Sequence, residues 1–122
     1  MLVTSACLAI FIGLVHSYLG ERYILTRLFK GDLPKLLGSD WFTKRTLRFA
    51  WHLTTVAWWG FAAILFLLTN PSGDIQKQIL VVIAGVFFVS GLFSSVLTKG
   101  KHISWIFFWL IASLSFYTAL FS

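Results

Sequence analysis

The chain has 122 residues, of which 58% are hydrophobic and only 11% are charged. This composition excludes an ordinary soluble domain and predicts an all-α integral membrane protein. The formal net charge of +6 is explained by basic connections between membrane spans, so no nucleic-acid partner is expected.

Four long apolar runs predict four transmembrane helices, over residues 2–20, 46–69, 77–98 and 102–121. Each run is close to the ~20 residues that cross ~30 Å of hydrocarbon. The first run has no basic segment before it, so we interpret it as a retained helix rather than a cleaved signal peptide. Residues 1–122 are therefore expected to form a single four-helix bundle domain in the membrane.

The connection after the first helix, residues 24–42, mixes apolar and basic side chains. Leu25, Leu28, Phe29 and Leu33 recur at helical spacing, which favours a short amphipathic helix along the membrane surface. Its basic side chains would attract anionic lipid. Snorkelling anchors are the favoured explanation of these side chains, and a landing site for a soluble partner or an anionic substrate is the alternative.

The other two connections, residues 70–74 and 98–101, are short. Short connections force consecutive helices to pack as antiparallel neighbours. The third predicted helix is rich in small residues, which favours close helix contact in lipid, although some of them could line a cavity instead. These small residues are Ala84, Gly85, Ser90, Gly91, Ser94 and Ser95.

Basic residues predict the orientation of the helices. Lys77 lies in the opposite half of the protein from all the other basic residues, which fall on the first and third connections. The positive-inside rule then places both of these connections in the cytoplasm and both termini outside, an N-out/C-out arrangement. We expect a multi-pass protein of the bacterial inner (plasma) membrane.

The three histidines are predicted to lie at one depth, near the cytoplasmic ends of three different helices. They are His16, His52 and His102, and Glu21 is the acidic residue nearest to them on this side. Ionisable side chains within the bilayer are costly, so they indicate a functional site by default. Arg22 or Arg48 could instead neutralise Glu21, and the histidines could simply pair with polar groups across the bundle.

Two kinds of ligand fit these residues. A divalent metal would use imidazole and carboxylate ligands, from His16, His52, His102 and Glu21. A redox cofactor, haem b or a quinone, would use histidines with tryptophan packing around a ring. The residues expected to contact that cofactor are His16, Gly20, His52, Trp59 and Trp105.

Two short strings carry a resemblance to known families. His-Ser-Tyr-Leu-Gly-Glu-Arg at 16–22 and Arg-Phe-Ala-Trp-His-Leu at 48–53 resemble those of a family of small bacterial four-helix membrane proteins with no assigned function. Locally, His16, Gly20 and Arg22 are similar to the His-x-x-x-Gly-x-Arg pattern of some membrane-anchor subunits of succinate dehydrogenase and fumarate reductase. That second resemblance implies that His16 is a haem ligand.

The sequence thus favours a small membrane protein with a histidine-centred polar site, which binds a redox cofactor or a metal. Transport of a small solute, a proton or a metal ion by a homo-oligomer is the main alternative. A third interpretation is an accessory subunit that packs on a larger membrane complex. Whether the protein is an enzyme stays open, because no specific catalytic motif is present.

Overall fold

The computed structural model describes residues 1–121, and among them it forms only helices and their connections. The first long helix runs from Leu2 to Leu28 in three consecutive pieces: α1 (Leu2–Leu19), the π-helical segment η1 (Gly20–Leu25) and α2 (Thr26–Leu28). The other long helices are α3 (Trp41–Thr69), α4 (Ile75–Leu97) and α5 (Ser104–Phe121). All four are long and apolar enough to cross a membrane. The predicted all-α membrane fold is confirmed, and the chain is a multi-pass membrane protein.

The boundaries differ from the expected ones mainly around the first connection. Gly20 keeps helical dihedrals, φ −60° and ψ −50°, so the first helix continues past residue 20 as a π-helix. The predicted amphipathic surface helix is therefore not a separate element, and residues 29–40 contain no helix. At the other end of this connection, α3 already begins at Trp41 rather than at residue 46. Basic side chains can extend a helix beyond its apolar part, because they reach water from within the turn.

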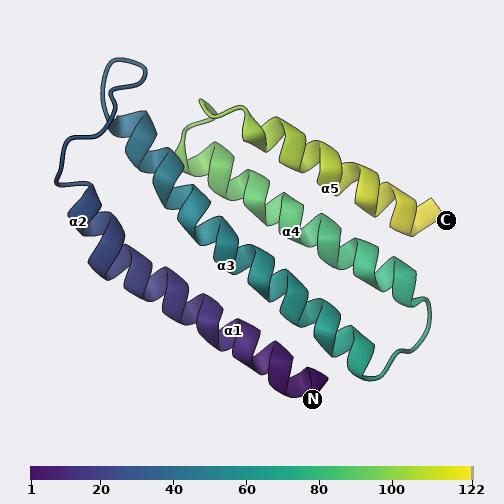
Figure 1. Ribbon diagram of the computed structural model, residues 1–122. Helices are drawn as coiled ribbons and strands as arrows, with labels where there is room; N and C mark the ends of the chain where they lie inside the picture. Colours follow the sequence, from purple (N-terminus) through teal and green to yellow (C-terminus); the bar gives the residue numbers. More distant parts are fainter. Residues whose placement is uncertain (122) are drawn as a thin grey trace.

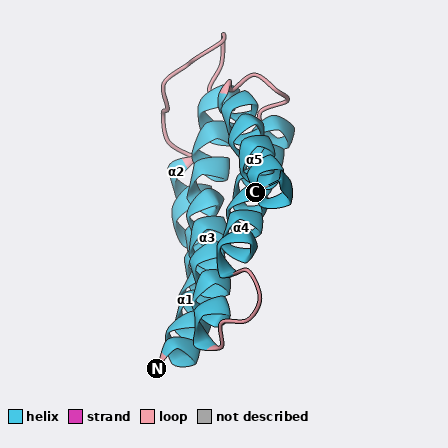
Figure 2. Cartoon of the chain, turned by 90° about the vertical axis from the view of Figure 1, so that its right-hand side faces the viewer, coloured by secondary structure: helices cyan, strands magenta, loops and turns pink. Residues whose placement is uncertain are grey.

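The four long helices lie side by side in one open row (Figure 1). The first helix packs on α3, α3 packs on α4, and α4 packs on α5, whereas α1 and α5 do not touch each other. In the side view of Figure 2 the helices lie largely behind one another, as expected for a single layer. The short connections do produce antiparallel neighbours, as predicted. The row is open because no helix closes it from α5 back to α1.

Small side chains fill the seams between the helices. Ala84, Gly91 and Ser94 of α4 are buried, so close packing is confirmed for these members of the predicted small-residue set. Gly85, in contrast, is exposed, and nothing lies within 4 Å of where its Cβ would be. Small residues allow two helix backbones to approach each other in lipid, where no hydrophobic driving force holds helices together.

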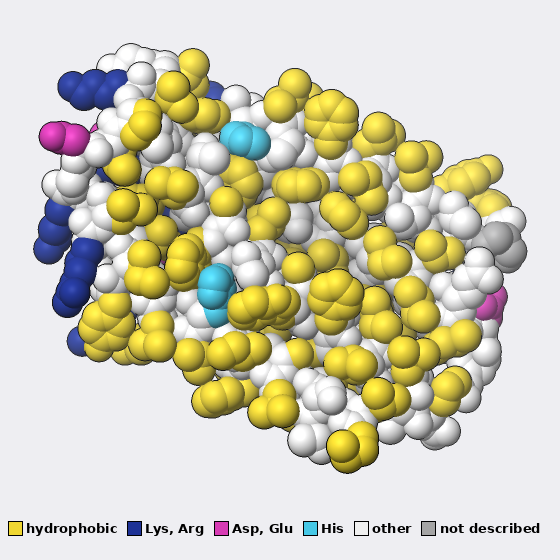
Figure 3. Space-filling view, in the orientation of Figure 1, with side chains coloured by type: hydrophobic (Ala, Val, Ile, Leu, Met, Phe, Trp, Pro, Cys, Tyr) yellow, Lys and Arg dark blue, Asp and Glu magenta, His cyan; other side chains and the backbone are white. Residues whose placement is uncertain are grey.

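The surface is apolar along the helices and basic at one end. Figure 3 shows hydrophobic side chains over most of this face, and Lys and Arg gathered at the end that carries the α2–α3 and α4–α5 connections. The two chain ends and the α3–α4 connection lie at the opposite end (Figure 1). Such a distribution fits a protein whose long sides contact lipid and whose basic end contacts headgroups.

Candidate functional site

His16 is held by Trp51 of α3. The His16 Nε2 atom lies 3.1 Å from the Trp51 carbonyl oxygen, and the Trp51 indole N–H donates to the His16 carbonyl over 3.0 Å. The two rings stack with their centroids 4.6 Å apart. Because a carbonyl only accepts, Nε2 of His16 must carry the proton. His16 therefore serves as one half of a reciprocal lock between α1 and α3.

Gly20 provides the space for this lock. A Cβ at Gly20 would collide with the Trp51 indole. The space beside Gly20 is thus occupied by an indole of the protein itself. The same arrangement recurs where Trp59 lies over Gly13 and donates to the Ile10 carbonyl over 3.3 Å. A third tryptophan repeats it between α5 and α4.

That third example is Trp109, which lies over Gly91 and donates to the Phe88 carbonyl over 3.2 Å. Trp59 and Trp109 each follow a histidine by seven residues in the chain. Both indoles lie over a glycine of the neighbouring helix, so this shared spacing of His and Trp has a counterpart in packing. It does not extend to the histidines, because His52 lies within α3 and His102 lies before α5 begins.

His52 connects Glu21 to a chain of hydroxyl groups. Its Nε2 lies 3.0 Å from Glu21 Oε2, and its Nδ1 lies 2.9 Å from the Ser17 hydroxyl. Arg48 holds the same carboxylate through two contacts, Nη2 to Oε1 at 2.7 Å and Nε to Oε2 at 3.2 Å. Arg48, rather than Arg22, is therefore the partner of Glu21. Such a two-pronged geometry is the stronger form of ion pair.

The hydroxyl chain continues from Ser17 into the α1–α3 seam. Ser17 Oγ lies 2.6 Å from Thr55 Oγ1, and Thr55 donates to the Gly13 carbonyl over 3.1 Å. Thr55 is buried and only 5% exposed. The chain from Glu21 to Gly13 thus runs from the basic end of the row toward its middle, through one imidazole and two hydroxyls.

The hydrogen bonds around His52 can be satisfied whether its imidazole carries one proton or two. With two protons, Nδ1 donates to Ser17, Ser17 donates to Thr55, and Nε2 donates to Glu21. With one proton on Nε2, the hydroxyls reverse, so Thr55 donates to Ser17 and Ser17 donates to Nδ1. The reversal gives up only the Thr55–Gly13 bond. Each hydroxyl is therefore a rotating donor that can follow the protonation of the imidazole.

The hydrogen-bonded side chains Ser17, His52 and Thr55 face a groove along the row of helices. Ser17, His52 and Thr55 line one part of a groove of about 720 Å³ between α3 and α4. The rest of its lining consists of Val56, Trp59, Gly60, Ala63, Val82, Gly85, Val86, Val89 and Phe93. Its volume is in the range that holds small organic ligands, ~300–1,000 Å³. It combines a long apolar wall with a single polar end.

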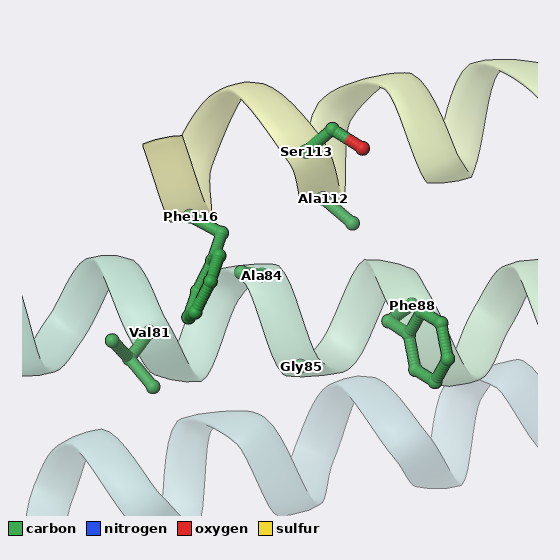
Figure 4. Close-up of a pocket in the computed structure, with 7 residues that line it drawn as sticks. All are labelled: Val81, Ala84, Gly85, Phe88, Ala112, Ser113 and Phe116. Atoms are coloured by element: carbon green, nitrogen blue, oxygen red, sulfur yellow. The ribbon is translucent and has the colours of Figure 1, made fainter. Parts of the chain in front are cut away.

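A second hollow, of about 340 Å³, lies between α4 and α5 (Figure 4). Its lining is Val81, Ala84, Gly85, Phe88, Ala112, Ser113 and Phe116. Phe116 and Ala112 point from α5 toward α4 in this view, and Ser113 is the single hydroxyl side chain in the lining. Without a charged group or a hydrogen-bonded chain, this hollow suits an acyl chain or a packing contact rather than a polar ligand.

The predicted metal ligands do not form one group. His102 packs its ring on Phe42 and Phe49 of α3, at centroid distances of 5.8 and 5.0 Å, and its Nδ1 lies 2.8 Å from the Ser104 hydroxyl. Within residues 1–121, no set of three or more His, Cys, Asp and Glu side chains is placed to hold a metal ion. Of the four predicted ligands, only His52 and Glu21 share a direct contact.

The predicted cofactor residues separate in a similar way. His52 and Trp59 both line the α3–α4 groove, whereas His16 and Gly20 are engaged with Trp51. Trp105 donates its indole N–H to the Gly100 carbonyl over 3.0 Å, so it stabilises the α4–α5 turn instead of lining the groove.

Comparisons with protein-family models, curated proteins and solved structures find no match.

Two site residues, Ser17 and Thr55, were not among those predicted, and Arg48 was expected only as one of two possible partners of Glu21. Their signal was present as helical spacing, because Ser17 and Glu21 lie one turn apart on the first helix. Arg48, His52 and Thr55 likewise follow one another at spacings of four and three on α3. What the spacing did not indicate was that these two stripes face each other.

Proposed function

We propose that this protein binds an amphipathic, lipid-soluble molecule in the α3–α4 groove, with its polar head at Ser17, His52 and Thr55. The groove, apolar along its length and polar at one end, carries this proposal. The ligand class that fits best is an isoprenoid quinone or its quinol form. Such a molecule has a long apolar tail and a ring with oxygen atoms that accept or donate hydrogen bonds.

The hydrogen-bonding capacity of the site supports both forms of that ligand. A quinol hydroxyl can donate to a free lone pair of Ser17 or Thr55 without breaking an existing bond. A quinone carbonyl needs a donor, which Thr55 can supply by releasing the Gly13 carbonyl. That release costs little, because the Gly13 carbonyl belongs to a helix and has its backbone partner.

Haem b fits the side chains less well than a quinone. An axial ligand needs a free ring nitrogen, and Nε2 of His16 is bonded to the Trp51 carbonyl. Both ring nitrogens of His52 have partners as well. Haem ligation by His52, or by Nε2 of His16, would therefore require these contacts in the α1–α3 seam to be broken. An absorbance spectrum before and after reduction tests this directly, because bound haem gives a Soret band.

Replacement of His52 by alanine is expected to weaken quinone binding by roughly fivefold, because the imidazole that orients the Ser17 hydroxyl at the ligand head is lost, an effect comparable with one hydrogen bond of ~1 kcal/mol. The measurement is equilibrium binding of decyl-ubiquinone to the full chain in mild detergent. His102→Ala is the matched control, because His102 does not line the groove. Unchanged binding by His52→Ala, or equal losses in both variants, would contradict the proposal.

We further propose an N-out/C-out orientation in a bacterial inner membrane, which the basic end of the row supports. A cysteine placed at Ser72 is expected to react with a membrane-impermeant maleimide from outside, whereas one placed at Ser39 should not. Cys7 is exposed, so both variants need a Cys7→Ala background. Labelling of the Ser39 position from outside would show that the protein has the opposite orientation.

A further inference from the structure

Three cationic side chains converge on one indole at the basic end of the row. The Trp41 ring centroid lies 5.7 Å from the Arg45 guanidinium carbon, 5.7 Å from Lys99 Nζ and 5.2 Å from Lys101 Nζ. Trp41 and Arg45 belong to the first turns of α3, whereas both lysines come from the α4–α5 turn. Two segments far apart in the sequence therefore build this cluster together.

The backbone of the α4–α5 turn presents the two lysines. Lys99 has φ 52°, in the left-handed region that non-glycine residues rarely adopt, and Gly100 follows with φ 75°. The turn is held by the Trp105 indole, which donates to the Gly100 carbonyl, and by the Gly100 N–H, which donates to the Ser95 carbonyl over 2.8 Å. Lys99 thus keeps an unfavourable backbone conformation that brings its ammonium group over Trp41.

No carboxylate of the described chain forms an ion pair with these three cations. The nearest acid in sequence, Asp40, is paired with Lys44 over 2.9 Å, and none of the ion pairs within residues 1–121 includes Arg45, Lys99 or Lys101. Like charges gathered on one ring repel one another, and the attraction of each to the indole face offsets only part of this. An anion between them would remove the repulsion.

We propose that Trp41, Arg45, Lys99 and Lys101 bind the phosphate group of an anionic phospholipid, at a site separate from the α3–α4 groove. Guanidinium and ammonium groups are the usual partners of phosphate. The lipid source is favoured over free phosphate because the cluster lies at the end of membrane-spanning helices, beside exposed apolar side chains. Ile103, in the same turn as the two lysines, is 64% exposed and is placed to contact the acyl region.

The test is binding of dioleoyl phosphatidylglycerol to the full chain in a neutral detergent, followed by native mass spectrometry. Each cation near an anionic lipid contributes about fivefold in affinity, so Lys99→Gln/Lys101→Gln should weaken binding by roughly 25-fold. The matched control Lys30→Gln/Lys35→Gln removes the same charge from the first connection and should stay within about twofold. Lys99→Arg/Lys101→Arg keeps both charges and should retain binding, which separates loss of the site from loss of the turn.

Two further arms identify the ligand. Dioleoyl phosphatidylcholine, which is zwitterionic, should bind more weakly than phosphatidylglycerol, and inorganic phosphate should not displace the bound lipid at equal concentration. Equal weakening of phosphatidylglycerol binding in both glutamine variants would overturn the proposed site. It would mean that basic residues attract the lipid wherever they lie at this end of the protein. Displacement by inorganic phosphate would overturn the lipid source.

Discussion

Replacement of Gly20 by alanine is expected to lower the free energy of unfolding by about 1–3 kcal/mol, the usual cost of overpacking a tight contact. The added methyl group would occupy the position of the Trp51 indole. To avoid the clash, Trp51 must leave His16, and both hydrogen bonds of the reciprocal lock are weakened. The measurement is thermal unfolding in mild detergent, followed by circular dichroism.

Gly85→Ala is the matched control within the same protein. Gly85 also lies within a helix, but its added Cβ meets no atom within 4 Å. Alanine is favoured over glycine in a helix by up to about 1 kcal/mol, so this variant should be neutral or more stable. The two substitutions are chemically identical, but only Gly20→Ala is expected to lower the free energy of unfolding.

A double-mutant cycle shows whether the indole causes the difference. In a Trp51→Ala background the space beside Gly20 is free, so Gly20→Ala should then have little further effect. Two independent, additive losses would instead mean that Gly20 acts through the backbone of the π-helical segment. Such a result would contradict the lock between α1 and α3.

Replacement of Gly85 by leucine is expected to reduce quinone binding by about tenfold or more, since overpacking of ~1–3 kcal/mol corresponds to roughly 5- to 150-fold in affinity. Gly85 lies in the wall of the groove, and its Cβ position is open. The larger side chain would therefore fill the space proposed for the apolar tail. The assay is the same titration with decyl-ubiquinone.

This variant separates the contribution of the apolar groove to ligand binding from that of the polar side chains at its end. It leaves Ser17, His52 and Thr55 untouched, so the unfolding midpoint should stay close to that of the parent protein. Gly31→Leu is the matched control, because it adds the same side chain at an exposed glycine that does not line this groove. Undiminished binding by a folded Gly85→Leu protein would show that the ligand lies elsewhere.

The sequence alone was sufficient to predict the all-α membrane fold and the end of the protein at which basic residues gather. Four apolar runs of membrane-spanning length leave the backbone no alternative to helix, because every polar backbone group must be satisfied within its own segment. The short connections likewise require antiparallel neighbours. These features depend on local composition, which a single chain displays without knowledge of its contacts.

The end of the first helix could not be predicted in this way. Gly20 and the polar residues after it are typical of a helix end. The helix continues nevertheless, because Trp51 occupies the space beside Gly20 and Glu21 meets Arg48 and His52. Contacts with α3 thus outweigh the local preference of the chain.

Tertiary structure alone decided what each histidine does. The sequence predicts that His16, His52 and His102 lie at a similar depth, but depth is one coordinate, and contact also depends on rotation about each helix and on which helices are neighbours. His16 meets an indole, His52 meets a carboxylate and a hydroxyl, and His102 meets two phenylalanines. His16 and His102 both reach α3, at Trp51 and at two phenylalanines, and His52 belongs to that helix, so the three rings meet different residues of α3 and not one another. The composition of each helix determined its place in the membrane, and packing between helices determined its chemistry.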